Sequence, residues 1–145
     1  LMCLRVFVDG SENLYNELSP FAISLGSAFQ KVNFLRDIKD DSNILNRVYF
    51  PNVDMDNFNE DSKKEIIEEI EEDFKNAVKG IIRLPKNSKF AVYIAYRYYF
   101  KLLKKLKRIS SENIVKKRVR IHNFQKFIVI ARSYVKYQLN LIQWI

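Results

Sequence analysis

Apolar residues recur every three or four positions along most of this 145-residue chain, which is the spacing of amphipathic helices. Such patterns cover residues 11–41, residues 61–82, a strongly aromatic stretch after Pro85, and residues 123–145. Acidic residues fill the polar face of the second pattern, while the stretch between the first two is irregular. Only three glycines and three prolines interrupt the chain. We therefore predict a single all-α domain over residues 1–145.

The first pattern carries a polar stripe inside "LGSAFQKVNFLRDIKDD", residues 25–41. With about 3.6 residues per turn, the stripe occupies an arc of roughly 80°. Its members are Gln30, Asn33, Asp37 and Asp41, and the opposite side carries Leu25, Ala28, Val32 and Leu35. Phe29 and Phe34 border the stripe on either side. We therefore expect the polar groups to line an enclosed cleft rather than open water.

Asp37 and Asp41 lie one helical turn apart, where two carboxylates repel each other unless a cation is near. The ligands on offer are carboxylate and amide oxygens, which suit a hard divalent ion such as Mg²⁺. Mg²⁺ usually binds through one or two carboxylates together with substrate phosphates, so a diphosphate ligand is expected. Arg36 is placed to meet a phosphate oxygen or to pair with Asp40. A solvated charged face is the alternative that spacing alone leaves open.

The residue string "GSAFQKVNFLRDIKDD", followed by "NRVYFP", closely resembles the second aspartate-rich motif of the squalene and phytoene synthase family. That motif is written G-x-A-x-Q-x-x-N-x-x-R-D-x-x-E-D, then R-x-Y-x-P. Asp40 replaces the usual glutamate, which keeps the charge and shortens the reach. "KKRVRIHNFQK" resembles the late basic segment of the family, and Tyr99 falls about where these enzymes place a tyrosine facing the substrate.

The resemblance implies the class I terpenoid synthase fold and a transferase of isoprenoid biosynthesis, including the carotenoid branch. Such enzymes join two C15 or C20 prenyl diphosphates head to head by Mg²⁺-assisted loss of diphosphate. The implied catalytic residues are Arg36, Asp37, Asp41 and Tyr49; the implied Mg²⁺ ligands are Asn33, Asp37 and Asp41; the implied substrate contacts are Gln30, Asn33, Arg36, Arg47, Tyr99 and Arg118. Phe29, Phe34 and Ile38 would wall the prenyl tails. NADPH would be used only by a reducing, squalene-type parent enzyme.

The first aspartate-rich motif of the family, D-x-x-x-D, does not occur before Gly26. The sequence also opens abruptly with apolar residues. We therefore expect the chain to be the C-terminal part of a longer prenyltransferase, with half of a two-sided metal site. Such a half should bind Mg²⁺–diphosphate weakly and should not turn over. Its uncovered apolar face would favour pairing with a second copy.

The chain is strongly basic, with a formal net charge of +8 and a pI near 9.5. The basic residues concentrate between Arg97 and Lys126 beside several tyrosines, so a helical module that binds nucleic acid or an anionic membrane surface is the alternative function. The acidic helix at 61–82 argues against nucleic acid. Cys3, the single cysteine, is expected to be a buried, reduced thiol, which favours a cytoplasmic location with or without peripheral membrane contact.

Overall fold

The computed structural model describes residues 1–38, 50, 58–116 and 119–139. Its helices in chain order are α1 (Met2–Phe7), α2 (Glu12–Asp37), α4 (Glu60–Ile81), α5 (Lys86–Arg108), α6 (Ser111–Lys116) and α7 (Asn123–Gln138). Within the described ranges every regular element is a helix, which confirms the predicted all-α class. Helix α6 was not predicted from the sequence.

The helix boundaries follow from local chemistry. The Ser11 hydroxyl accepts a hydrogen bond of 3.4 Å from the backbone N–H of Leu14 and so caps α2 at its N-terminus. The Asn59 side chain caps α4 more completely, because its Oδ1 accepts from two backbone N–H groups, at 2.9 and 3.0 Å. Asp9 and Gly10 both have positive φ, 52° and 74°, and form the turn between α1 and α2.

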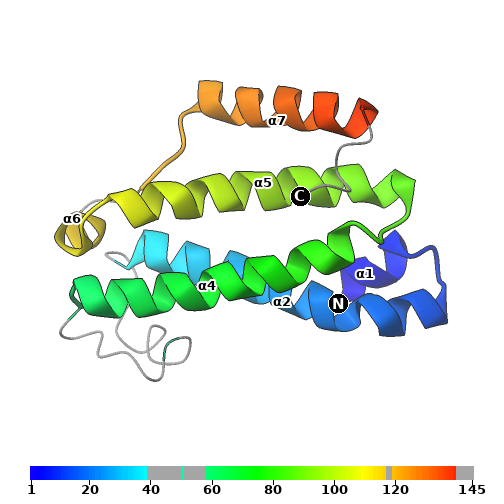
Figure 1. Ribbon diagram of the computed structural model, residues 1–145, viewed down its shortest axis with the longest axis horizontal. Coiled ribbons are helices and arrows are strands. Elements are labelled where there is room, and N and C mark those ends of the chain that lie inside the picture. Colours follow the sequence, from blue (N-terminus) through cyan, green and yellow to red (C-terminus); the bar gives the residue numbers. More distant parts are fainter. Residues whose placement is uncertain (39–49, 51–57, 117–118, 140–145) are drawn as a thin grey trace.

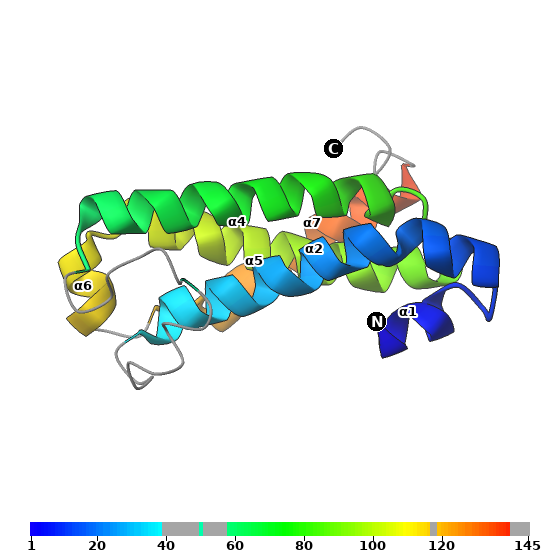
Figure 2. The same cartoon turned by 90° about the horizontal axis from the view of Figure 1, so that it is seen from below.

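Helices α2 and α4 run antiparallel and side by side, with α5 packed against both (Figures 1 and 2). They pack tightly at Gly80, where an added Cβ would clash with the side chain of Phe21. Farther along the pair, Lys31 of α2 donates to Asp73 at 2.7 Å and to Glu69 at 2.5 Å. Glycine at one end and this ion-pair cluster toward the other therefore fix the register of α2 on α4.

The core lies between α2, α4 and α5. Its fully buried members include Val32, Leu35, Ile66, Ile70, Phe74, Tyr93, Leu102 and Leu106. Ala28, Val32 and Leu35, on the side of α2 opposite the polar stripe, are fully buried. Helix α1 packs on α2, whereas α7 forms an outer layer on α5 (Figure 1). No helix in the described part of the chain is both long and apolar enough to cross a bilayer.

One sequence expectation about α1 is wrong. Cys3 was expected to be buried, yet it is exposed. The short helix α1 turns Leu4 into the core instead and leaves Cys3 at the rim of a cavity. Because α1 has only six residues, its apolar pattern was too short to indicate which side faces inward.

Candidate functional site

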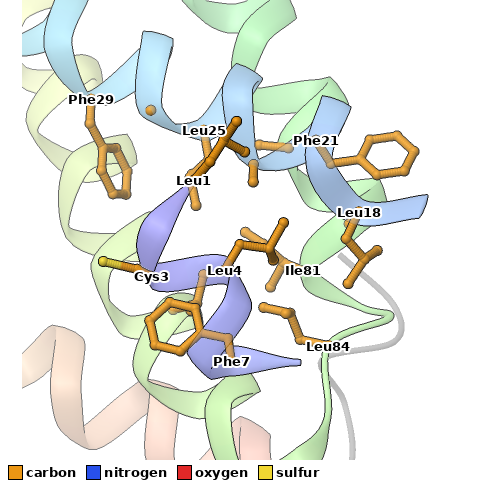
Figure 3. A pocket seen from close by; sticks show the side chains of 15 residues that line it. Leu1, Cys3, Leu4, Phe7, Leu18, Phe21, Leu25, Phe29, Ile81 and Leu84 are labelled. Atoms are coloured by element: carbon orange, nitrogen blue, oxygen red, sulfur yellow. The ribbon is translucent and has the colours of Figure 1, made fainter. Parts of the chain in front are cut away.

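An apolar cavity of about 310 Å³ opens between α1, α2 and α4 (Figure 3). Leu4 and Phe7 of α1 face Leu18 and Leu25 of α2 across it, and Ile81 of α4 closes one side. The volume is at the low end of the roughly 300–1,000 Å³ typical of small-molecule pockets.

The cavity-lining face of α2 becomes polar one turn beyond Phe29. By helical geometry Leu18, Leu25, Phe29, Asn33 and Arg36 share an arc of about 80° along the helix. Leu18, Leu25 and Phe29 line the cavity, and Phe29 marks its end nearest the polar residues (Figure 3). The same helix face therefore offers apolar surface along one part and polar groups along the next.

Tyr99 of α5 contacts both the apolar and the polar part of this α2 face. Its ring stacks on Phe29 with centroids 4.0 Å apart and an interplanar angle of 18°. Its hydroxyl oxygen accepts a hydrogen bond from Asn33 Nδ2 at 3.3 Å. Because the hydroxyl oxygen already accepts from Asn33, the O–H hydrogen remains available for an acceptor on a ligand.

Asn33 carries the most informative atom of the site. Its Oδ1 is buried and has no hydrogen-bond partner within the described part of the chain. Native proteins seldom leave a buried acceptor in this state, because its desolvation costs about 1–3 kcal/mol. An amide oxygen buried beside a carboxylate-bearing turn is a suitable ligand for a hard cation.

Arg36 and Asp37 form a two-pronged ion pair. Arg36 Nε donates to Asp37 Oδ1 at 2.9 Å, and Nη2 donates to Oδ2 at 2.5 Å. The hydrogen bond to Asp37 is the main reason that the pKa of Arg36 is raised above its ordinary value. The two side chains are only 20 % and 17 % exposed, so the pair is well shielded. Helical spacing points to Asp40 as a partner of Arg36, whereas the structure pairs Arg36 with its direct neighbour Asp37.

The remaining predicted site residues divide into two groups. Gln30 is exposed and sits on the solvent side of α2, apart from the Asn33–Tyr99 contact. Asp41, Arg47, Tyr49 and Arg118 lie outside the described residues, as does Asp40. The structure thus brings together Asn33, Arg36, Asp37 and Tyr99 from two helices. Among the described residues, no group of three or more His, Cys, Asp or Glu side chains gathers as a metal site.

The sequence analysis missed the α1 side of the cavity and the role of Gly26. Gly26 lies on the cavity wall, and a Cβ there would meet no atom within 4 Å, so a larger side chain fits at this position without a clash. Of the three residues predicted to wall the prenyl tails, Phe29 lines the cavity, whereas Phe34 and Ile38 do not. The spacing of apolar residues reveals the face of one helix but not which short helix covers it, so only the family motif could have pointed to Gly26.

Taken together, the fold and site define an all-helical protein with an apolar cavity, one wall of which is a helix face that continues into amide, guanidinium and carboxylate groups. A family model described as squalene/phytoene synthase matches residues 1–125, and the chain belongs to this family. The family has the all-α isoprenoid synthase fold, with which the helical architecture agrees, and acts as transferases in isoprenoid biosynthesis. No curated protein and no solved structure matches the chain.

Proposed function

We propose that the chain binds one prenyl diphosphate as its Mg²⁺ complex, as the second-motif side of an enzyme that joins two such substrates head to head. The observation that carries the proposal is the change along one face of α2. Cavity-lining Leu18, Leu25 and Phe29 give way to Asn33, whose buried oxygen has no partner in the described part of the chain, and then to the Arg36–Asp37 pair.

The polar end fits a diphosphate head held by a divalent cation. Asp37 and Asn33 are one turn apart on α2 and offer oxygen ligands, with Asp41 expected one turn farther on. Bound Mg²⁺ would neutralise the charge of the departing diphosphate. Once Asp37 is shared with a cation, Arg36 can turn from it toward a phosphate oxygen, with Arg118 as a second expected contact.

The apolar end fits the prenyl tail. Hydrocarbon side chains line almost all of the cavity, and Phe29 and Tyr99 stack where the tail would meet the head group. Stacked aromatic faces next to a leaving diphosphate also stabilise a developing allylic cation. The Tyr99 hydroxyl, held by Asn33, is aligned to donate to a diphosphate oxygen.

On its own, this chain is expected to bind one substrate only. It contains one aspartate-rich motif, and its cavity has room for about one tail. Joining two substrates requires a second diphosphate to be ionised close by. We therefore expect binding without head-to-head joining by this chain.

The test is titration calorimetry with a non-hydrolysable farnesyl diphosphate analogue, with and without Mg²⁺. The chain would be compared with Asp37→Asn/Asp41→Asn, which removes two carboxylate charges and keeps side-chain shape. Asp9→Asn/Asp61→Asn is the matched control, because both positions are exposed and lie outside the site.

The proposal expects Mg²⁺-dependent binding by the unmodified chain and by the control, with at least about a tenfold loss in Asp37→Asn/Asp41→Asn. Equal affinity in all three proteins, or an affinity that is the same with and without Mg²⁺, would contradict the proposal. Binding to nucleic acid in place of the analogue would instead support the alternative drawn from the basic composition.

A further inference from the structure

Helix α7 presents its apolar side to solvent. Its six exposed large apolar residues are Phe124, Phe127, Ile130, Tyr134, Val135 and Leu139, with exposures from 46 % at Ile130 to 73 % at Phe124. By helical geometry they occupy about half of the circumference. The opposite side carries Val129 and Ser133, which are buried. Helix α7 itself lies against α5 (Figure 1).

The orientation of α7 is fixed by contacts to its polar side and ends. Lys101 of α5 donates to the carbonyl of Gln125 at 3.4 Å, and the Tyr137 hydroxyl donates to the carbonyl of Lys86 at 3.2 Å. Phe90 packs on Tyr137 with ring centroids 4.9 Å apart. Tyr134, at one edge of the row, also contacts Phe90, with ring centroids 6.0 Å apart. These contacts anchor one side of α7 on α5 and leave the rest of the aromatic and aliphatic row facing outward.

Positive charge borders this row on both edges. Arg132 lies next to one edge of the apolar arc, and Lys126 lies about 40° beyond the other edge. Lys136 lies farther round, toward the side of the helix that faces α5. The excess of positive charge extends over the whole α5–α7 layer. Between residues 86 and 139 the sequence holds fifteen lysines and arginines and a single acidic residue, Glu112. Fifteen of the seventeen acidic residues lie instead between residues 1 and 72, away from this layer in sequence.

We infer that the outer face of α7 docks on an anionic lipid surface. A helix with an aromatic and aliphatic row flanked by basic residues lies in the plane of a bilayer, with the row among the acyl chains and the charges at the lipid phosphates. A symmetric contact with a second copy would bring the basic edges of two α7 helices together, so charge disfavours it. Nucleic acid would use the charges but not the aliphatic row.

The test is flotation of the chain with lipid vesicles. One set contains phosphatidylcholine alone, and the other contains phosphatidylcholine with phosphatidylglycerol. Phe124→Gln/Phe127→Gln removes two exposed rings without touching the core, since both are mostly solvent-exposed. Val6→Gln/Ile23→Gln makes the same kind of change at exposed positions of α1 and α2 and is the matched control.

The chain and the control should float with the anionic vesicles only, and less so at high salt. Phe124→Gln/Phe127→Gln should bind about tenfold or more weakly, because binding strength scales with buried apolar area. In a Trp144→Phe background, a tryptophan introduced by Phe127→Trp should be quenched by brominated lipids. Equal binding to both vesicle types, equal binding by both double variants, or no vesicle binding would overturn the inference.

Two other results would also overturn it. If sedimentation velocity shows a dimer that the Phe124→Gln/Phe127→Gln change converts to monomer, and vesicles do not bind, the face is an interface between copies. If the chain ignores vesicles and binds DNA or RNA, the basic layer serves nucleic acid. Neither result bears on the calorimetric test of the α2 site, so the two proposals fail separately.

Discussion

Replacing Asn33 by leucine should stabilise the fold while abolishing ligand binding. Leucine has a similar volume, and the change removes a buried Oδ1 with no partner in the described part of the chain, which relieves about 1–3 kcal/mol. It also removes the 3.3 Å hydrogen bond to Tyr99, which contributes about 0.5–1.5 kcal/mol. The net expectation is a gain of about 1 kcal/mol, or roughly 3 °C in Tm for a domain of this size.

Thermal and urea unfolding of the chain and of Asn33→Leu measure this gain. Asn76→Leu on α4 is the matched control for helix propensity, because the polar contacts of Asn76 are exposed to water. Calorimetry with Mg²⁺ and the farnesyl diphosphate analogue should then show that Asn33→Leu alone has lost binding. If Asn33→Leu is about 1 kcal/mol or more less stable than the control, or binds the analogue normally, Asn33 has a structural role and the argument for its oxygen as a ligand fails.

Three further predictions concern the walls of the site and the α2–α4 contact. Gly26→Leu should place a side chain in the cavity, since a Cβ there meets no atom within 4 Å, and so weaken binding of the farnesyl analogue while leaving Mg²⁺–pyrophosphate binding intact. An equal loss of affinity for both ligands in calorimetry would argue against separate head and tail sites. Gly80→Ala should lower the unfolding free energy by about 1–2 kcal/mol, because overpacking against Phe21 outweighs the gain in helix propensity; a gain in urea midpoint would show that α2 and α4 are not in close contact there. Lys31→Met should cost about 2 kcal/mol by leaving Asp73 and Glu69 without their cation. Burial acts to lower the pKa of Lys31, but hydrogen bonds to Asp73 and Glu69 raise it above its ordinary value. The contribution of Lys31 to the free energy of unfolding should therefore be complete at neutral pH and fade only as the pH rises through that raised pKa. If the chain and Lys31→Met already have equal unfolding free energies at neutral pH, this reasoning is contradicted.

The sequence predicted the long helices well because their apolar periods are long and their caps are explicit. Residues 61–82 were expected to be helical, and α4 spans Glu60–Ile81 with Asn59 as its cap. Helix α6, with six residues, holds too few turns to produce a recognisable period. Its place depends on tertiary contacts, including the Glu60 carboxylate, which accepts from the backbone N–H of Ser111.

The site was predictable only in part. Asn33, Asp37 and Tyr99 were singled out from the motif and its resemblance, and the structure brings Asn33 and Tyr99 into contact. The cavity depends on how α1 packs across α2, which no periodicity within either helix encodes. An uncovered apolar face was expected, but its location on α7 was not, because a periodic pattern locates the apolar face of a helix without saying whether a partner covers it.

The most direct test of the central claim is paramagnetic NMR with Mn²⁺ in place of Mg²⁺. In the presence of the farnesyl diphosphate analogue, the account predicts that Mn²⁺ broadens the backbone amide signals of Asn33 and Asp37 and the side-chain amide of Asn33, while signals from α7 stay sharp. Asp37→Asn/Asp41→Asn should abolish this broadening. If Mn²⁺ instead broadens signals along the exposed acidic face of α4, around Glu65 and Glu68, the cation is held by that face and α2 is not the diphosphate-binding helix.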